Sequence, residues 1–178
     1  MSKKIGVGFA ALLSLAYSGI LTYYFYTERE AAAELEKEGK YTCLYDMRTT
    51  GVQNSNTDVA PNWKDWMTTA FICYAILSGI ALFALIGAFV PAFRAVAGCC
   101  TCCAQIFSLV VIIGLTAVRF SDSGEYCVMK AGEKLTNGND RVSMEFKDDG
   151  EFLKTCIILM WCLCCVHCCC LGIGLAPV

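Results

Sequence analysis

Residues 66–90 read WMTTAFICYAILSGIALFALIGAFV, an apolar run without a single Asp, Glu, Lys or Arg. A helix rises about 1.5 Å per residue, so a run of this length crosses the hydrocarbon core of a bilayer, which is about 30 Å thick. Three further uncharged runs meet the same criterion, at residues 5–26, 95–118 and 156–175. The sequence therefore predicts an all-α fold: one domain over residues 1–178, built as a four-transmembrane-helix bundle with two extramembrane loops on one side.

The composition agrees with a membrane protein. Hydrophobic residues make up 57% of the chain and charged residues only 17%, whereas a soluble domain carries about 25% charged residues. The formal net charge of −2 excludes nucleic acid as an expected partner, because binding phosphates requires a basic surface. The lipid bilayer is the expected partner, and no feature points to a small-molecule substrate.

The arrangement of charge bears on the topology. Four spans place both termini on one side of the membrane and the loops, residues 27–65 and 119–154, on the other, and these loops hold all 16 acidic residues. A raw count of basic residues would place the loops inside, but Lys3 and Lys4 flank the first span, which usually dominates orientation. We expect the termini inside and the loops outside. The first span resembles a signal peptide, and we expect it to be retained rather than cleaved.

The loops carry local signals of their own. The segment from Thr27 to Gly39 is rich in Ala and Glu and ends in glycine, which predicts that the first helix continues about 12 residues beyond the membrane. In the second loop, Asn137-Gly138 is a turn signal, and the runs 124–135 and 141–146 on either side predict a hairpin.

Each loop contains one cysteine, Cys43 in the first and Cys127 in the second. In an oxidising compartment these two are expected to form a disulfide between the loops. A bridge closing a loop of this length contributes roughly 4 kcal/mol in the chain-entropy description. Two free thiols, or a bond between chains, are the alternatives.

Ten other cysteines gather at the membrane face that carries the termini. They form two groups, Cys99, Cys100, Cys102 and Cys103, and Cys162, Cys164, Cys165, Cys168, Cys169 and Cys170. Cysteines near the cytoplasmic face accept palmitate, and the candidate acylation sites are Cys99, Cys100, Cys102, Cys103, Cys168, Cys169 and Cys170. The alternative is that they are small apolar packing residues. Pairs with C-x-x-C spacing in both groups, together with His167 in the second, would suit zinc or an iron–sulfur cluster. However, charged thiolates are costly in lipid, so we expect no metal and no cofactor beyond covalent palmitate.

Small residues indicate where helices pack. Gly6, Ala10, Ser14, Ser18 and Thr22 recur at every fourth position of the first span, and Ala75 and Gly79 have the same spacing in the second. Such a pattern lets the backbone of a neighbouring helix approach closely, within the bundle or between subunits. These are the candidate helix-packing residues.

The layout resembles the tetraspan class of membrane proteins, which includes claudin-like, MARVEL-like and tetraspanin proteins. The shared features are four spans, inside termini, two outer loops, loop cysteines and cysteines at the inner leaflet. Claudin-like proteins are similar also in having cysteines after the second and fourth spans, here Cys99, Cys100 and Cys168 to Cys170. The first loop has one cysteine where claudins have two after a Trp, and the tetraspanin Cys-Cys-Gly is missing. The resemblance therefore implies the architecture and carries over neither a function nor a functional residue.

The four predicted spans contain no Asp, Glu, Lys or Arg, and no nucleophile motif is present, which favours a protein that is not an enzyme. The expected role is a structural or accessory subunit of a membrane assembly, which acts through helix packing and loop contacts. Its partners would be other membrane-protein subunits, including further copies of itself in a homo-oligomer. The alternatives are an oligomeric channel and an accessory subunit of an energy-transducing complex. The expected location is the plasma membrane or an endomembrane, with the mitochondrial inner membrane as the alternative.

Overall fold

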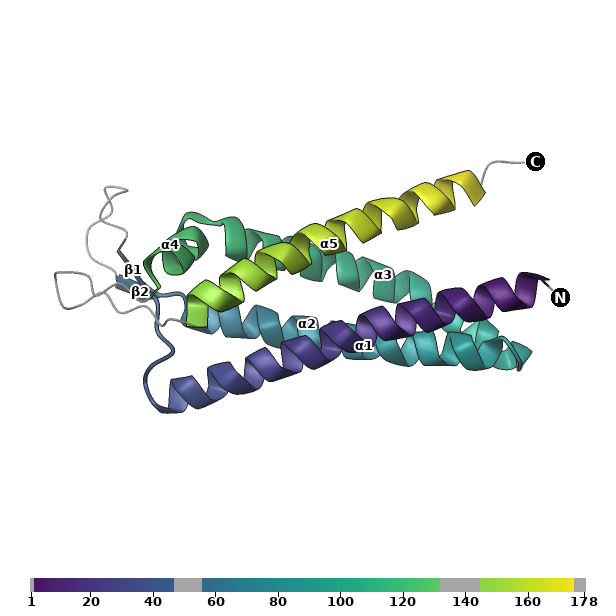
Figure 1. Cartoon of the computed structure of the whole chain (residues 1–178), viewed down its shortest axis with the longest axis horizontal. Coiled ribbons are helices and arrows are strands. Elements are labelled where there is room, and N and C mark those ends of the chain that lie inside the picture. The colour runs from purple at the N-terminus through teal and green to yellow at the C-terminus, as the bar shows by residue number, and fades with distance from the viewer. Residues whose placement is uncertain (1, 47–55, 132–144, 175–178) are drawn as a thin grey trace. The chain divides into compact units, whose positions relative to one another are not determined.

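The computed structural model describes residues 2–46, 56–131 and 145–174. Its helices are α1 (Ser2–Lys37), α2 (Ala60–Gly87), α3 (Pro91–Phe120), α4 (Asp122–Lys130) and α5 (Glu145–Gly174), as labelled in Figure 1. Two short strands, β1 (Leu44–Asp46) and β2 (Asn56–Asp58), pair antiparallel with Leu44 opposite Asp58. The described part of the chain is thus predominantly helical, as predicted, with one small sheet in the first loop.

Three helical segments within the described residues are long and apolar enough to cross a membrane. They are Gly8–Lys37, Ala60–Gly87 and Ala95–Phe120. Only 22 to 28% of the residues in their most apolar windows are buried within the protein. Most apolar side chains therefore face outwards, which is unfavourable in water and favourable in lipid. The chain is a membrane protein.

The predicted fourth span, residues 156–175, begins within α5 and covers its last 19 residues, and residue 175 lies outside the described residues. This helix begins with charged residues, and its side chains are described only as far as Cys162. The count of four spans is not confirmed by the described residues and stays a prediction.

The chain divides into two compact units. The first comprises Met1–Glu38 and Pro61–Val111, and the second comprises Gly39–Ala60 and Ile112–Val178. The prediction of one domain over residues 1–178 stays a prediction.

In the first unit, α1 and α2 lie side by side and antiparallel (Figure 1). Four contacts join the helices in opposite chain order: Ser18 with Ser78, Phe25 with Tyr74, Tyr26 with Phe71, and Glu36 with Lys64. Four buried residues of α1 recur every seven positions, at Ala11, Ser18, Phe25 and Ala32. A seven-residue repeat is the spacing that keeps one helix face against a neighbouring helix.

The end of α1 agrees with the sequence prediction. The helix extends to Lys37, well beyond its apolar part, and Gly39 follows in the left-handed region with a φ of 65°. Glycine has no Cβ and adopts this conformation without strain, so it ends the helix and turns the chain.

Candidate functional site

The second unit contains the predicted disulfide. Cys43, just before β1, is bonded to Cys127 of α4, with 5.9 Å between their Cα atoms. Both cysteines are fully buried, and α4 also packs against β1 and α5. The bond therefore joins two loops that are 84 residues apart in sequence, which is the pairing that the sequence predicts. We refer to residues 41–46, β2, Arg119 at the end of α3, α4 and the first turns of α5 as the clamp region.

Asp58 fixes the backbone around Cys43. Its Oδ1 accepts hydrogen bonds from the backbone N–H of Cys43, at 3.1 Å, and from that of Ala60, at 3.0 Å. The carbonyl of Cys43 accepts in turn from the N–H of Val59 at 3.0 Å. The N–H groups of Cys43 and Ala60 have no partner within a helix or strand, so the Asp58 carboxylate supplies one to each. It thus caps the first turn of α2 and fixes the backbone at Cys43.

The predicted hairpin at residues 124–135 is wrong, because residues 122–130 form the helix α4. Ser121 is the N-cap, and its Oγ accepts from the N–H of Gly124 at 3.2 Å. Asp122 and Glu125 lie in the first turn, where acidic side chains interact favourably with the helix dipole. A Cβ at position 124 would overlap the carbonyl oxygen of Val118, so this sharp turn out of α3 requires glycine. The hairpin's second run, 141–146, lies largely outside the described residues.

Arg119 joins the end of α3 to the start of α5. It is 5% exposed, and its Nε donates a hydrogen bond of 2.7 Å to the carbonyl of Gly150. Its guanidinium also approaches the carboxylate of Glu151, at 3.7 Å, but this carboxylate is largely exposed. The buried hydrogen bond is the stronger of the two interactions, because solvent screens the ion pair.

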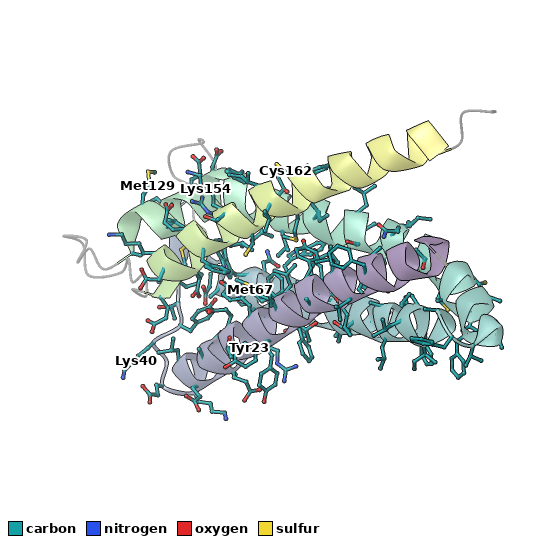
Figure 2. The ribbon with its side chains drawn as sticks, turned by 45° about the vertical axis from the view of Figure 1, so that its right-hand side comes forward. Tyr23, Lys40, Met67, Met129, Lys154 and Cys162 are labelled. Atoms are coloured by element: carbon teal, nitrogen blue, oxygen red, sulfur yellow. A yellow bond between two sulfur atoms is a disulfide. The ribbon has the colours of Figure 1, made fainter. Side chains whose placement is uncertain are left out.

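The remaining contacts make the clamp region a small packed core. The rings of Tyr41 and Phe146 stack with their centroids 4.6 Å apart, and both residues are buried. Met129 of α4 and Lys154 of α5 are exposed on the outer surface of this unit (Figure 2). The inner faces of α4 and α5 are therefore tightly packed, and their outer faces are accessible.

At Gly150 the backbone of α5 lies close against Val128 of α4, and this contact supports a test of the packing. A Cβ at position 150 would overlap Cγ2 of Val128. We expect Gly150→Ala to destabilise the protein by about 1–3 kcal/mol, the usual cost of overpacking. In the double variant with Val128→Ala, which removes the overlapping atoms, most of this cost should disappear. The measurement is the thermal midpoint of all four proteins in detergent, and strictly additive effects would contradict this contact.

In the first unit, hydroxyl groups connect the helices. Ser78 Oγ lies 3.0 Å from Ser18 Oγ and 3.4 Å from Thr22 Oγ1. The Tyr74 hydroxyl makes side-chain hydrogen bonds with Tyr17 on α1 and Ser108 on α3. Interhelical hydrogen bonds of this kind stabilise helix pairs in lipid, on average by about 0.6 kcal/mol.

The candidate helix-packing residues are only partly buried. Ser18 is buried at the α2 contact, whereas Ala10 and Ser14 are exposed. Gly6 is not among the residues whose burial is described. Ala75 and Gly79 are half-buried, and a Cβ at position 79 would meet no atom within 4 Å. A spacing of four advances about 400° around a helix, so the pattern drifts by about 40° at each step and leaves the contact face.

The two helices that carry the cysteine clusters present thiols to the outside. Cys99, Cys100 and Cys103 of α3 and Cys162 of α5 are free and exposed, and Cys162 is labelled in Figure 2. Cys73 and Cys156 are free and buried. The described side chains do not include those of the other clustered cysteines, namely Cys102, Cys164, Cys165, Cys168, Cys169 and Cys170. Within the described part of the chain, no group of three or more His, Cys, Asp or Glu could hold a metal.

Comparison with known proteins adds no relative: no protein-family model, curated protein or solved structure matches the chain. In the described residues the clamp region offers a disulfide, a buried guanidinium hydrogen bond and an accessible outer surface. This combination suits a rigid binding surface.

Several residues of the clamp region were not predicted from the sequence. Asp58, Arg119 and Gly150 each make a contact that depends on where a distant segment lies. For Asp58 a signal was present, since an Asp two positions before the start of a helix is a common cap. For Arg119 and Gly150 we find no local signal.

Proposed function

We propose that this protein is a non-enzymatic tetraspan subunit that organises a membrane assembly. In this proposal α5 supplies the fourth span, and the clamp region lies on the oxidising side of the plasma membrane or an endomembrane. The buried Cys43–Cys127 disulfide carries the proposal. Disulfides persist in oxidising compartments and are rare where thiols are kept reduced.

The rigidity of the clamp region supports a role in binding. A surface that is ordered before binding loses less conformational entropy when a partner docks. Here the disulfide, the Asp58 cap and the Arg119 hydrogen bond each restrain the backbone of this region. The exposed carboxylates of Glu30, Glu34 and Glu36, on the extension of α1, add a charged surface for contacts outside the membrane.

The test is the size and composition of the native particle in a mild detergent. The tagged full-length protein is isolated from its own membranes, separated on a native gel and analysed for stoichiometric partner chains. We expect a particle larger than one chain in its micelle, and we expect the Cys43→Ala/Cys127→Ala variant to reduce it to the single-chain form. The matched control is Cys73→Ala, which removes a free thiol of the first unit and should leave the particle unchanged. A monomeric wild-type particle without partners would overturn the proposal.

A further inference from the structure

We propose that Cys99, Cys100 and Cys103 of α3 form an S-acylation site that takes a long-chain fatty acyl group. The inference rests on α3 spanning the membrane as in the proposed function, but it concerns the opposite end of α3 from the clamp region. It selects three of the seven candidate acylation sites. All three thiols are free and exposed, so each has access to an acyl donor.

The position of the thiols around α3 supports the site. At 100° per residue, Cys99 and Cys103 fall in the middle of a narrow face, and Cys100 flanks it. The other members of this face are exposed apolar residues, namely Val96, Ile106, Val110 and Ile113. The opposite face holds buried residues, among them Ala97, Ala104 and Val111. An acyl chain on Cys99 or Cys103 would therefore extend over the side of α3 that faces lipid.

The depth of the thiols supports it as well. The apolar segment Ala95–Phe120 has 26 residues and so rises about 39 Å, about 9 Å more than the hydrocarbon core. This excess can protrude at either end of the segment. For any division of it, Cys99 and Cys100 lie within about 8 Å of the hydrocarbon boundary and Cys103 lies within about 12 Å. The Cα–Cβ bonds of a helix tilt towards its N-terminus, which here is the nearer boundary. The thiols of Cys99 and Cys100 are thus the closest of the three to the depth of the lipid ester groups, and that of Cys103 lies one helical turn further in.

The chemistry is a thioester exchange with an acyl-coenzyme A. The sulfur of a deprotonated cysteine attacks the carbonyl carbon of the donor thioester. The bond from that carbon to the coenzyme A sulfur breaks, a new thioester forms at cysteine Sγ, and the proton of the cysteine thiol ends on the released coenzyme A thiol. No oxidant or reductant is needed. The buried thiols of Cys73 and Cys156 cannot reach such a donor without unfolding.

The experiment counts thioesters on the full-length protein in cell membranes. Disulfides are reduced, free thiols are blocked with N-ethylmaleimide, thioesters are cleaved with neutral hydroxylamine, and each released thiol is tagged with a polyethylene-glycol maleimide. We expect the wild-type protein to show hydroxylamine-dependent gel shifts and the Cys99→Ala/Cys100→Ala/Cys103→Ala variant to lose at least one of them. The control Cys73→Ala should keep the full set.

The outcomes separate this proposal from the proposed function. No hydroxylamine-dependent shift in the wild type, or the same number of shifts in the triple variant, would overturn the acylation site. Mass spectrometry of the wild-type peptide from Ala95 to Arg119 gives the same answer if the variant fails to fold. Alkaline carbonate extraction of the same membranes tests the span: a chain that stays in the pellet but shows no shift refutes the acylation alone.

Discussion

Replacing Cys43 and Cys127 together by alanine should lower the free energy of unfolding by about 4 kcal/mol, the largest effect we expect from any pair of substitutions. The bridge spans 84 residues of sequence, and without it the unfolded chain regains the entropy of that loop. Alanine is preferred to serine because both positions are fully buried, and burying a serine hydroxyl without a hydrogen-bond partner would add a cost unrelated to the bridge. In detergent the thermal midpoint should fall by on the order of 10 °C.

The control for this prediction is reduction of the wild-type protein. Mild reductant should leave the midpoint unchanged, because the sulfurs are buried, and reductant in partly denaturing conditions should lower it to that of the double alanine variant. Cys73→Ala, which also removes a buried cysteine but no bond, should shift the midpoint much less. Equal shifts for Cys73→Ala and for the double variant would show that lost packing, and not the bridge, is responsible.

The sequence predicted the membrane spans, which depend on composition over a long window, and the disulfide, which depends on a unique pairing of loop cysteines. Uncharged apolar runs mark the spans in α1, α2 and α3. In lipid a single run of this length satisfies the hydrogen bonds of its own backbone only as a helix. The disulfide was predictable because each loop holds one cysteine, so only one intramolecular pairing between the loops exists. The end of α1 was predictable from local propensity and from Gly39.

The sequence failed where distant segments decide the structure. Residues 124–130 form a helix that packs against β1 and α5, whose positions the local sequence does not reveal, and the one local signal, the N-cap at Ser121, was overlooked. The small residues of α1 repeat every four positions, whereas its buried residues Ala11, Ser18, Phe25 and Ala32 repeat every seven. Packing against α2 selected the second spacing, which includes the large Phe25 beside small residues, so a pattern of small side chains at every fourth position does not trace the contact face.

Arg119→Met should lower the free energy of unfolding by about 2–3 kcal/mol, the second largest expected effect. Methionine keeps much of the apolar stem but removes the donor, so the carbonyl of Gly150 loses its buried hydrogen bond to a charged group. The measurement is the thermal midpoint in detergent. Arg119→Lys should be intermediate, because the ammonium keeps the charge but lacks the planar fork that reaches Gly150 and Glu151 at once.

Glu151→Gln decides which interaction of Arg119 stabilises the clamp region. The Glu151 carboxylate lies 3.7 Å from the guanidinium and is 62% exposed, so the ion pair should contribute less than about 1 kcal/mol. We therefore expect Glu151→Gln to leave the midpoint almost unchanged, and the loss in Arg119→Met to be insensitive to salt. If Glu151→Gln cost as much as Arg119→Met, the ion pair would be the principal connection between α3 and α5. The backbone hydrogen bond at Gly150 would then be secondary, and high salt would loosen the clamp region.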